Sequence, residues 1–464
     1  MSDSSTNPEL RQLALLCLPT LSISLSANII IATLSDINHT FRGIEGIGGW
    51  SLLLYSTTAA SLSIAAGELG DRVGLRRVYG RGLTLYLIGS CIAALAINGS
   101  MLLAGRVISG TGAAILAPVA LAFLSRMYQG RDKPIAFGYW AASVTIGKVT
   151  GPILGGLIQA MSSWRWTFIV AAIPSLLGLI MIKNLPKFEK KEGTKKPPID
   201  LIGIVGLSAL PAIGLITLNL STRIQTNTLV ILIIIIITIG TLTWRHLNRT
   251  EHPAIPLSRI KASSWWRPTM LQLIIRIVFM AMLVILTSYF QNVRGESGIN
   301  ASQDLMPFVI AVGIMSFSSG YLSQSIGIRK LLQCVFVLAT FGAASLLSIS
   351  ESGFRPLDWI AIITIGILAG STSQLSRLSL SIFTPEESMR GASLNTMVIN
   401  LGLALGAAYP NMIHGIVDKG LHLGGPMNQT ELLFTMRVQI IILLLLFIAG
   451  TWQTRMVKEA QQVG

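Results

Sequence analysis

The sequence predicts an all-α membrane protein with fourteen membrane-spanning helices, and three observations lead to this fold class. First, 52% of its 464 residues are hydrophobic and only 12% are charged, whereas soluble globular domains carry roughly 25% charged residues. Second, the apolar residues come in runs of about twenty, the length at which a helix crosses roughly 30 Å of hydrocarbon. Third, most lysines and arginines fall in short stretches between these runs, as in the cytoplasmic loops of membrane proteins.

The spanning segments can be placed along the chain from their apolar composition. The clearest is 227–246, because Leu229 to Ile237 is an unbroken apolar run. The third and fourth segments are separated by Asn98, Gly99 and Ser100 alone. The fourteen segments lie near 13–35, 49–69, 78–98, 100–124, 136–160, 166–184, 200–219, 227–246, 269–290, 304–325, 330–350, 358–381, 392–416 and 434–454.

The positive charges orient these segments in the membrane. One set of loops holds Arg72, Arg76, Arg77, Arg81, Arg126, Arg131, Lys133, Arg329, Lys330 and the stretches 183–196 and 245–267. The positive-inside rule makes this set cytoplasmic, so both termini are cytoplasmic and the chain is a multi-pass protein of the inner membrane. The 382–391 loop supports this least, because Glu386 and Glu387 offset Arg390. The net charge of +15 is thus explained by the membrane, without nucleic acid.

The polar stretches and an internal repeat predict the domain organisation. Lys187–Pro198 and Arg245–Arg267 bracket the seventh and eighth spans, which we interpret as an insertion between two six-helix halves. The predicted domains are 1–184, the inserted region 185–268 and 269–464. Gly67–Arg77 and Gly320–Lys330 repeat the same spacing of glycines and basic residues. Parallel repeats of this kind are a known plan for secondary transporters.

Several stretches resemble the signatures of one family. Gly67–Arg77 resembles the major facilitator signature G-x-L-a-D-r-x-G-r-k. Leu102–Ala114 resembles l-x-x-x-R-x-x-q-G-x-g-a-a, and Gly147–Gly156 resembles g-x-x-x-G-P-x-x-G-G, the mark of antiporters. Arg390–Gly406 is similar to the thirteenth span of fourteen-helix drug:proton antiporters. The resemblance covers essentially the whole chain and implies the major facilitator fold, two six-helix bundles plus two inserted helices.

The resemblance implies gating roles for two groups of residues. In the family, the aspartate of the first signature pairs with arginines and helix ends to close the cytoplasmic side. In the third signature, small residues at four-residue spacing let helices approach closely, and this helix seals the pore. The matching residues here are Gly67, Asp71, Arg72, Gly74, Arg76, Gly151, Pro152, Gly155 and Gly156. The alternative for the charged turn is simple anchoring at the membrane surface.

The second signature places Arg106 within an apolar helix, where an unpaired cation is expensive. The resemblance implies a role in coupling or substrate binding. The alternative is a structural arginine that bonds to helix carbonyls.

The sequence departs from the family in the charges of its predicted interior. Ser26 stands where the first span of the drug antiporters usually carries an aspartate. Instead, the predicted spans contain the cations Lys148 and Arg276, in addition to Arg106. Neutral polar residues that could line a pathway are Asn28, Gln272, Asn395 and Asn400, each of which could equally form a helix–helix hydrogen bond. A cationic interior attracts anions, because Coulomb forces are strong in a low dielectric.

These observations leave three hypotheses for function. The leading one is a secondary active transporter that exports small organic compounds by alternating access, with an anionic, carboxylate-bearing or siderophore-like substrate. The second is a proton-coupled multidrug efflux pump for cationic or lipophilic drugs. If protons are counter-transported, the candidate proton acceptors are Glu68, Asp200 and Lys148. The third, a membrane enzyme or sensor, has no supporting motif. We therefore expect a monomeric transporter in the bilayer, with no catalytic residues, metal or cofactor.

Overall fold

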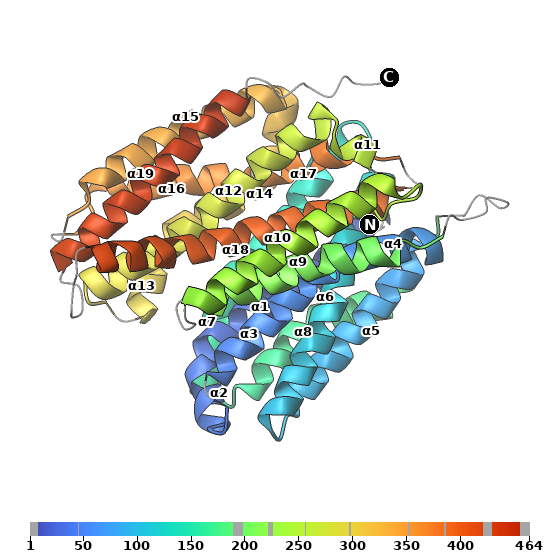
Figure 1. Ribbon diagram of the computed structural model, residues 1–464, viewed down its shortest axis with the longest axis horizontal. Helices are drawn as coiled ribbons and strands as arrows, with labels where there is room; N and C mark the ends of the chain where they lie inside the picture. Colours follow the sequence, from blue (N-terminus) through green and yellow to red (C-terminus); the bar gives the residue numbers. More distant parts are fainter. Residues whose placement is uncertain are drawn as a thin grey trace, which may run out of the picture. The chain divides into compact units, whose positions relative to one another are not determined.

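The structure is a computed structural model that describes residues 8–44, 46–188, 198–220, 226–255, 257–296, 298–350, 353–384, 387–420 and 429–454 (Figure 1). These residues form helices and no β-strand. The helices of the first part of the chain are α1 (Pro8–Ile29), η1 (Ile30–Thr33), α2 (Leu34–Thr40), α3 (Ile47–Ser61), α4 (Ser63–Val73), α5 (Leu75–Ala94), α6 (Gly99–Met127), α7 (Asp132–Met161), α8 (Arg165–Ile180), η2 (Ile182–Asn184), α9 (Leu201–Leu220), α10 (Thr226–Arg249) and α11 (Leu257–Ile260). Those of the second part are α12 (Ser263–Ser288), the π-helix η3 (Tyr289–Val293), α13 (Gly298–Asp304), α14 (Met306–Ser325), α15 (Ile328–Ser345), η4 (Leu346–Ser348), α16 (Pro356–Gly370), α17 (Thr372–Leu380), α18 (Ser388–Gly420) and α19 (Gln429–Thr454).

The apolar helices match the predicted spans in position. Within the described residues, eleven helical stretches are long and apolar enough to cross a membrane, and two shorter apolar helices lie at Arg165–Ile180 and Leu201–Thr217. The remaining predicted span coincides with α5, which carries Arg76, Arg77 and Arg81 near its start. The all-helical architecture is therefore as predicted, while the count of fourteen spans stays a prediction.

The chain divides into two compact units, and unit 1 holds the residues through Ile260 together with Phe383–Met397. Its tightest helix pair is α5 with α6. Gly89 on α5 and Gly105 and Gly112 on α6 lie so close to the facing backbone that a Cβ on any of them would clash. Small residues at such positions let two helices pack closely where the surrounding lipid provides no hydrophobic drive for helix association. This packing holds the middle of α6 at the centre of unit 1.

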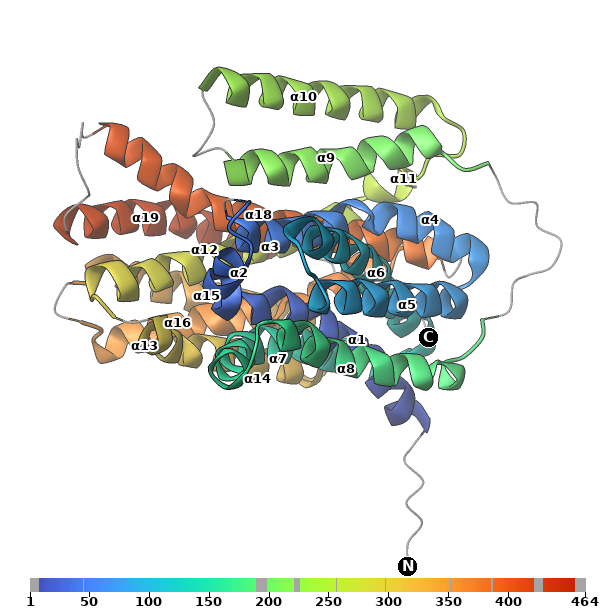
Figure 2. The same cartoon turned by 90° about the horizontal axis from the view of Figure 1, so that it is seen from below.

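The hairpin of α9 and α10 groups with unit 1, because α9 packs on α3 and α4 (Figure 2). Asp200 ties the hairpin together just before α9. Its carboxylate accepts hydrogen bonds from the backbone N–H groups of Gly203 (2.8 Å) and Ala254 (2.9 Å) and lies 2.6 Å from His246 Nε2. The predicted inserted region 185–268 thus contributes α9, α10 and α11 to unit 1, while its residues from Lys261 onward belong to unit 2. The division into three domains stays a prediction.

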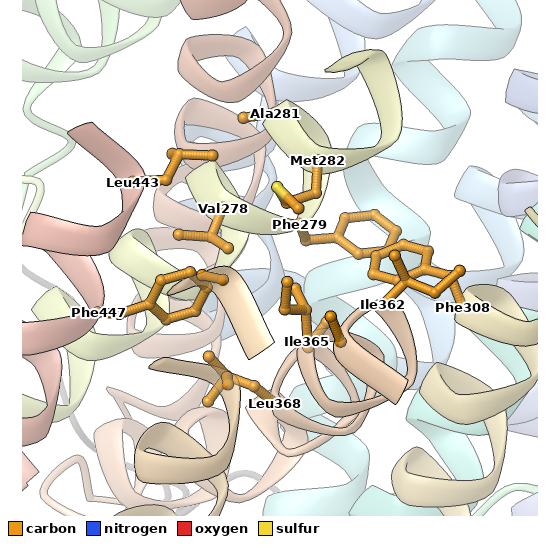
Figure 3. Close-up of a cluster of buried hydrophobic side chains, with 14 of the residues drawn as sticks. Val278, Phe279, Ala281, Met282, Phe308, Ile362, Ile365, Leu368, Leu443 and Phe447 are labelled. Carbon is orange, nitrogen blue, oxygen red and sulfur yellow. The ribbon is translucent and has the colours of Figure 1, made fainter. Parts of the chain in front are cut away.

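Unit 2 holds Lys261–Ile382 and the residues from Val398 onward. Its core is built mainly from α12, α14, α15, α16 and α19. Figure 3 shows where apolar side chains of α12, α14, α16 and α19 meet. Phe279 of α12 stacks on Phe308 of α14, with 5.8 Å between ring centroids. The helix α18 is continuous but begins in unit 1 and continues in unit 2.

Candidate functional site

Arg106, on α6 of unit 1, is fully buried, with 0% of its surface exposed. Its Nε donates a hydrogen bond to the Ser51 carbonyl of α3 (3.1 Å), and its Nη1 donates to Ser26 Oγ of α1 (3.1 Å). The guanidinium lies 4.1 Å from the centroid of the Tyr55 ring and 5.5 Å from that of Phe168. A cation over an aromatic face gains about 2 kcal/mol when desolvated. Neutral groups alone thus make up the described contacts of this buried cation.

Ser26 contacts Arg106 at the position where the resemblance led us to expect an aspartate. The surroundings keep α1 fixed there, because Tyr55 Oη donates to the Ile23 carbonyl (3.1 Å) and Tyr86 Oη donates to the Ser22 carbonyl (2.9 Å). In the described part of the chain, Arg106 Nη2 has no hydrogen-bond partner. The serine that departs from the family pattern is therefore in direct contact with the buried arginine.

Three glycines of α7 pack against α1. A Cβ on Gly147 would lie 2.8 Å from the Leu21 carbonyl oxygen, and one on Gly151 would lie 2.8 Å from Asn28 Cβ. Gly155 is closer still, against the carbonyl oxygen of Ile29. Gly156, by contrast, has nothing within 4 Å of that position. The small-residue packing expected of this helix thus involves Gly151 and Gly155 but not Gly156.

Lys148 is half-buried on α7, between two of the glycines that contact α1. Pro152 is half-buried one turn further along the same helix. Asn28, on the facing stretch of α1, donates its side-chain amide to the Ser24 carbonyl of its own helix (2.7 Å). The structure therefore places a cation and an amide beside the packed α1–α7 interface.

The turn between α4 and α5 depends on Gly74, which has a φ of +103°. Residues other than glycine rarely adopt this backbone conformation. Gly327 has a φ of +81° at the corresponding turn between α14 and α15, in keeping with the internal repeat. Arg76 Nη1 donates to the Leu185 carbonyl (3.3 Å). The side chains of Asp71 and Arg72 lie outside the described residues.

The first turns of α18 are joined to α4 and α6 by contacts that the sequence interpretation missed. Arg390 Nε lies 2.8 Å from Glu68 Oε2, and Arg126 Nε donates to Ser388 Oγ (2.7 Å). Gly67 lies against Ser393, so a Cβ on Gly67 would clash. The available signal was the pairing of one acid in the first signature with the single arginine of the 382–391 loop. Because Glu68 and Arg390 are far apart in the sequence, local patterns did not indicate that they pair.

The remaining predicted residues lie on α12 and α18. Gln272 is fully buried, and its Nε2 donates to Ser376 Oγ of α17 (2.7 Å). Arg276 is half-buried one turn further along α12, with its Cβ against Gly402 of α18. On α18, Asn395 is buried within the segment that belongs to unit 1, and Asn400 is half-buried within unit 2. The structure thus divides the predicted site residues between the two units.

Comparisons with known proteins agree with this architecture. The chain is 25% identical over 397 residues to "Drug efflux pump JefA" of Mycobacterium tuberculosis, which covers 83% of this chain and 77% of the relative. It is 26% identical over 328 residues to "Methylenomycin A resistance protein" of Bacillus subtilis, covering 68% of this chain and 69% of the relative. Among solved structures, the transporter FucP in the outward conformation shares the fold with a TM-score of 0.66 at 15% identity, covering 98% of this chain and 100% of FucP.

The sequence also matches a family as a whole. A sequence model described as "Major Facilitator Superfamily" matches residues 16–407, well over half of the chain. The three signatures lie within that range. The chain therefore belongs to the major facilitator superfamily and is a membrane transporter, not an enzyme.

Proposed function

We propose that this transporter exports small organic anions by alternating access across the inner membrane, with both termini cytoplasmic. The observation that supports this most is the neutral surroundings of Arg106, which faces Ser26 where an acid would cancel its charge. Lys148 adds positive charge within a spanning helix of unit 1, and Arg276 separately adds positive charge within a spanning helix of unit 2. A positive interior of low dielectric attracts an anion and repels a cation.

The membrane potential provides a driving force for the export of an anion. One negative charge that leaves an inside-negative cell gains roughly 2.3 kcal/mol per 100 mV. Net export of an anion can therefore proceed without a proton-carrying acid in the membrane. In this account the contacts at the start of α18 and the α1–α7 packing open and close the pathway.

A second candidate is a proton-coupled efflux pump for cationic or lipophilic drugs. The names of the relatives support it, since JefA is described as a drug efflux pump. It requires a carboxylate that binds the cation or carries the proton. The described contacts of Arg106 include none, and we therefore rank this candidate second.

The test is transport into inside-out vesicles that contain the purified protein. Wild type, Lys148→Ala and the charge-preserving Lys148→Arg are compared for uptake of citrate and of a cationic dye. We expect citrate uptake that falls at least tenfold in Lys148→Ala and is largely kept in Lys148→Arg. Uptake of the dye alone, with no effect of Lys148→Ala, would establish the second candidate.

A further inference from the structure

A stripe of polar side chains runs along one face of α12. Between Thr269 and Leu286 the helix is apolar except for Thr269, Gln272 and Arg276. Their spacing of three and four residues places them one above another on the helix. Polar groups at such depth in a spanning helix are expensive unless they are paired, and they usually mark a functional pathway.

A second stripe, of serine hydroxyls on α17, pairs with the first part of this one. Ser379 Oγ lies 3.1 Å from Thr269 Oγ1, and Ser376 Oγ accepts from Gln272 Nε2 at 2.7 Å. The next hydroxyl in the series, Ser373, turns to Ser319 of α14 instead (3.0 Å). The pairing of the two stripes therefore stops just before Arg276.

Two atoms are left without partners where the pairing stops. Within the described residues, Gln272 Oε1 and Arg276 Nε are buried and have no hydrogen-bond partner. Gln272 is 0% exposed. An unsatisfied buried polar group destabilises the protein, and a charged one does so more strongly. Because such groups are normally paired, a bound ligand is the natural partner for both.

We propose that Gln272 and Arg276 form a substrate-recognition pair for an organic anion that also carries a hydrogen-bond donor. The anionic group binds the Arg276 guanidinium, and a hydroxyl or amide N–H of the ligand donates to Gln272 Oε1. Since the two residues are one helical turn apart, the two ligand groups are about 6 Å apart. This inference rests on the proposed function, and it narrows the substrate class within it.

The test uses three rigid probes with the purified full-length chain in nanodiscs, with dissociation constants from calorimetry. 4-Hydroxybenzoate holds a carboxylate and a hydroxyl about 6 Å apart, which equals the rise of an α-helix over four residues. Benzoate lacks the hydroxyl, and 4-hydroxybenzyl alcohol lacks the charge. We expect wild type to bind 4-hydroxybenzoate about tenfold more tightly than benzoate, as one buried hydrogen bond allows.

Variants assign this preference to the pair. Gln272→Leu should reduce the tenfold ratio to about one while benzoate binding persists. Arg276→Gln should weaken the binding of both acids at least tenfold without affecting the binding of the alcohol. Arg276→Lys should retain part of the affinity that Arg276→Gln loses. The matched control is Gln439→Leu, a buried glutamine of the same unit whose Nε2 donates to the Pro410 carbonyl (2.8 Å). It should keep the wild-type ratio.

The outcomes separate this inference from the proposed function. If both acids bind but the ratio is the same in wild type, Gln272→Leu and Gln439→Leu, the recognition pair is wrong while anion transport stands. If neither acid binds more tightly than the alcohol in wild type, the proposed anion specificity is itself wrong. Thermal unfolding of each variant confirms that a lost ratio does not come from a lost fold.

Discussion

At the scale of single residues, the chain replaces an acid with a hydroxyl beside a buried arginine. The sequence identified both Ser26 and Arg106, and it predicted that the arginine must either face a polar interior or find a partner. It could not show that the two meet, because they are 80 residues apart and on different helices. The roles of Tyr55 and Phe168 as aromatic walls were also invisible, since an aromatic residue in an apolar run looks like any other core residue.

Restoring the acid tests this arrangement. Ser26→Asp places a carboxylate about 3 Å from the guanidinium, where the two charges attract strongly in a low dielectric. We expect citrate uptake to fall at least tenfold and uptake of a cationic dye to appear. Ser26→Asn, which has nearly the same shape without charge, should retain citrate uptake. Equal citrate uptake in Ser26→Asp and wild type would contradict the role assigned to the Arg106 charge.

At the scale of helices, the glycine signature of α7 has two different sides. Gly155 lies against the backbone of α1, whereas Gly156 faces open space. Overpacking a tight interface costs about 1–3 kcal/mol. We therefore expect Gly155→Ala to lower the thermal unfolding midpoint and the transport rate, and Gly156→Ala to leave both near wild type. Equal effects of the two substitutions on unfolding and transport would be evidence against this packing.

The ion pair between α4 and the start of α18 is a candidate gate. Glu68 is 4% exposed, and breaking a buried pair is costly because it leaves one charge alone. We expect Glu68→Gln and Arg390→Gln each to change the transport rate at least fivefold and to be non-additive when combined. The pair Arg259–Glu387 in the same region is more exposed, at 43% and 27%. It serves as the control, and its removal should have little effect.

The hairpin of α9 and α10 should be sensitive to acid through Asp200. Burial alone would raise the pKa of Asp200, but the hydrogen bonds from Gly203, His246 and Ala254 outweigh it and lower that pKa below its ordinary value of 3.8. A carboxyl with a lowered pKa stabilises the folded state at pH values above its pKa in the unfolded chain. This stabilisation is lost as the pH falls through the pKa of the carboxyl in the folded protein.

Asp200→Asn should therefore unfold at a lower temperature than wild type at pH 7. The difference should shrink below about pH 4, where the aspartate of the unfolded chain is protonated. This difference in unfolding temperature is measured by thermal unfolding in detergent between pH 3 and 7. The control is Asn248→Ala, two residues after His246 on α10. A difference that is constant across this range would mean that the Asp200 charge does not hold the hairpin.

At the scale of the whole molecule, apolar runs in the sequence predicted where the helices lie, whereas the contacts that group the helices had no local signal. Apolar runs of spanning length identify helices directly, so segments such as 227–246 coincide with observed elements. The grouping depends on contacts such as α9 on α3 and Glu68 with Arg390, which join residues far apart in the chain. No local pattern encodes these contacts. The assignment of α18 to both units has the same origin.

The central claim is that the potential, acting on a negatively charged substrate, drives export. It is tested most directly with wild-type protein in inside-out vesicles, by applying a lumen-positive potential without a pH gradient and then a pH gradient without a potential. We predict that citrate enters under the potential alone, with an inward movement of negative charge, and that the pH gradient alone gives little uptake. Uptake that follows the pH gradient and ignores the potential would contradict the account.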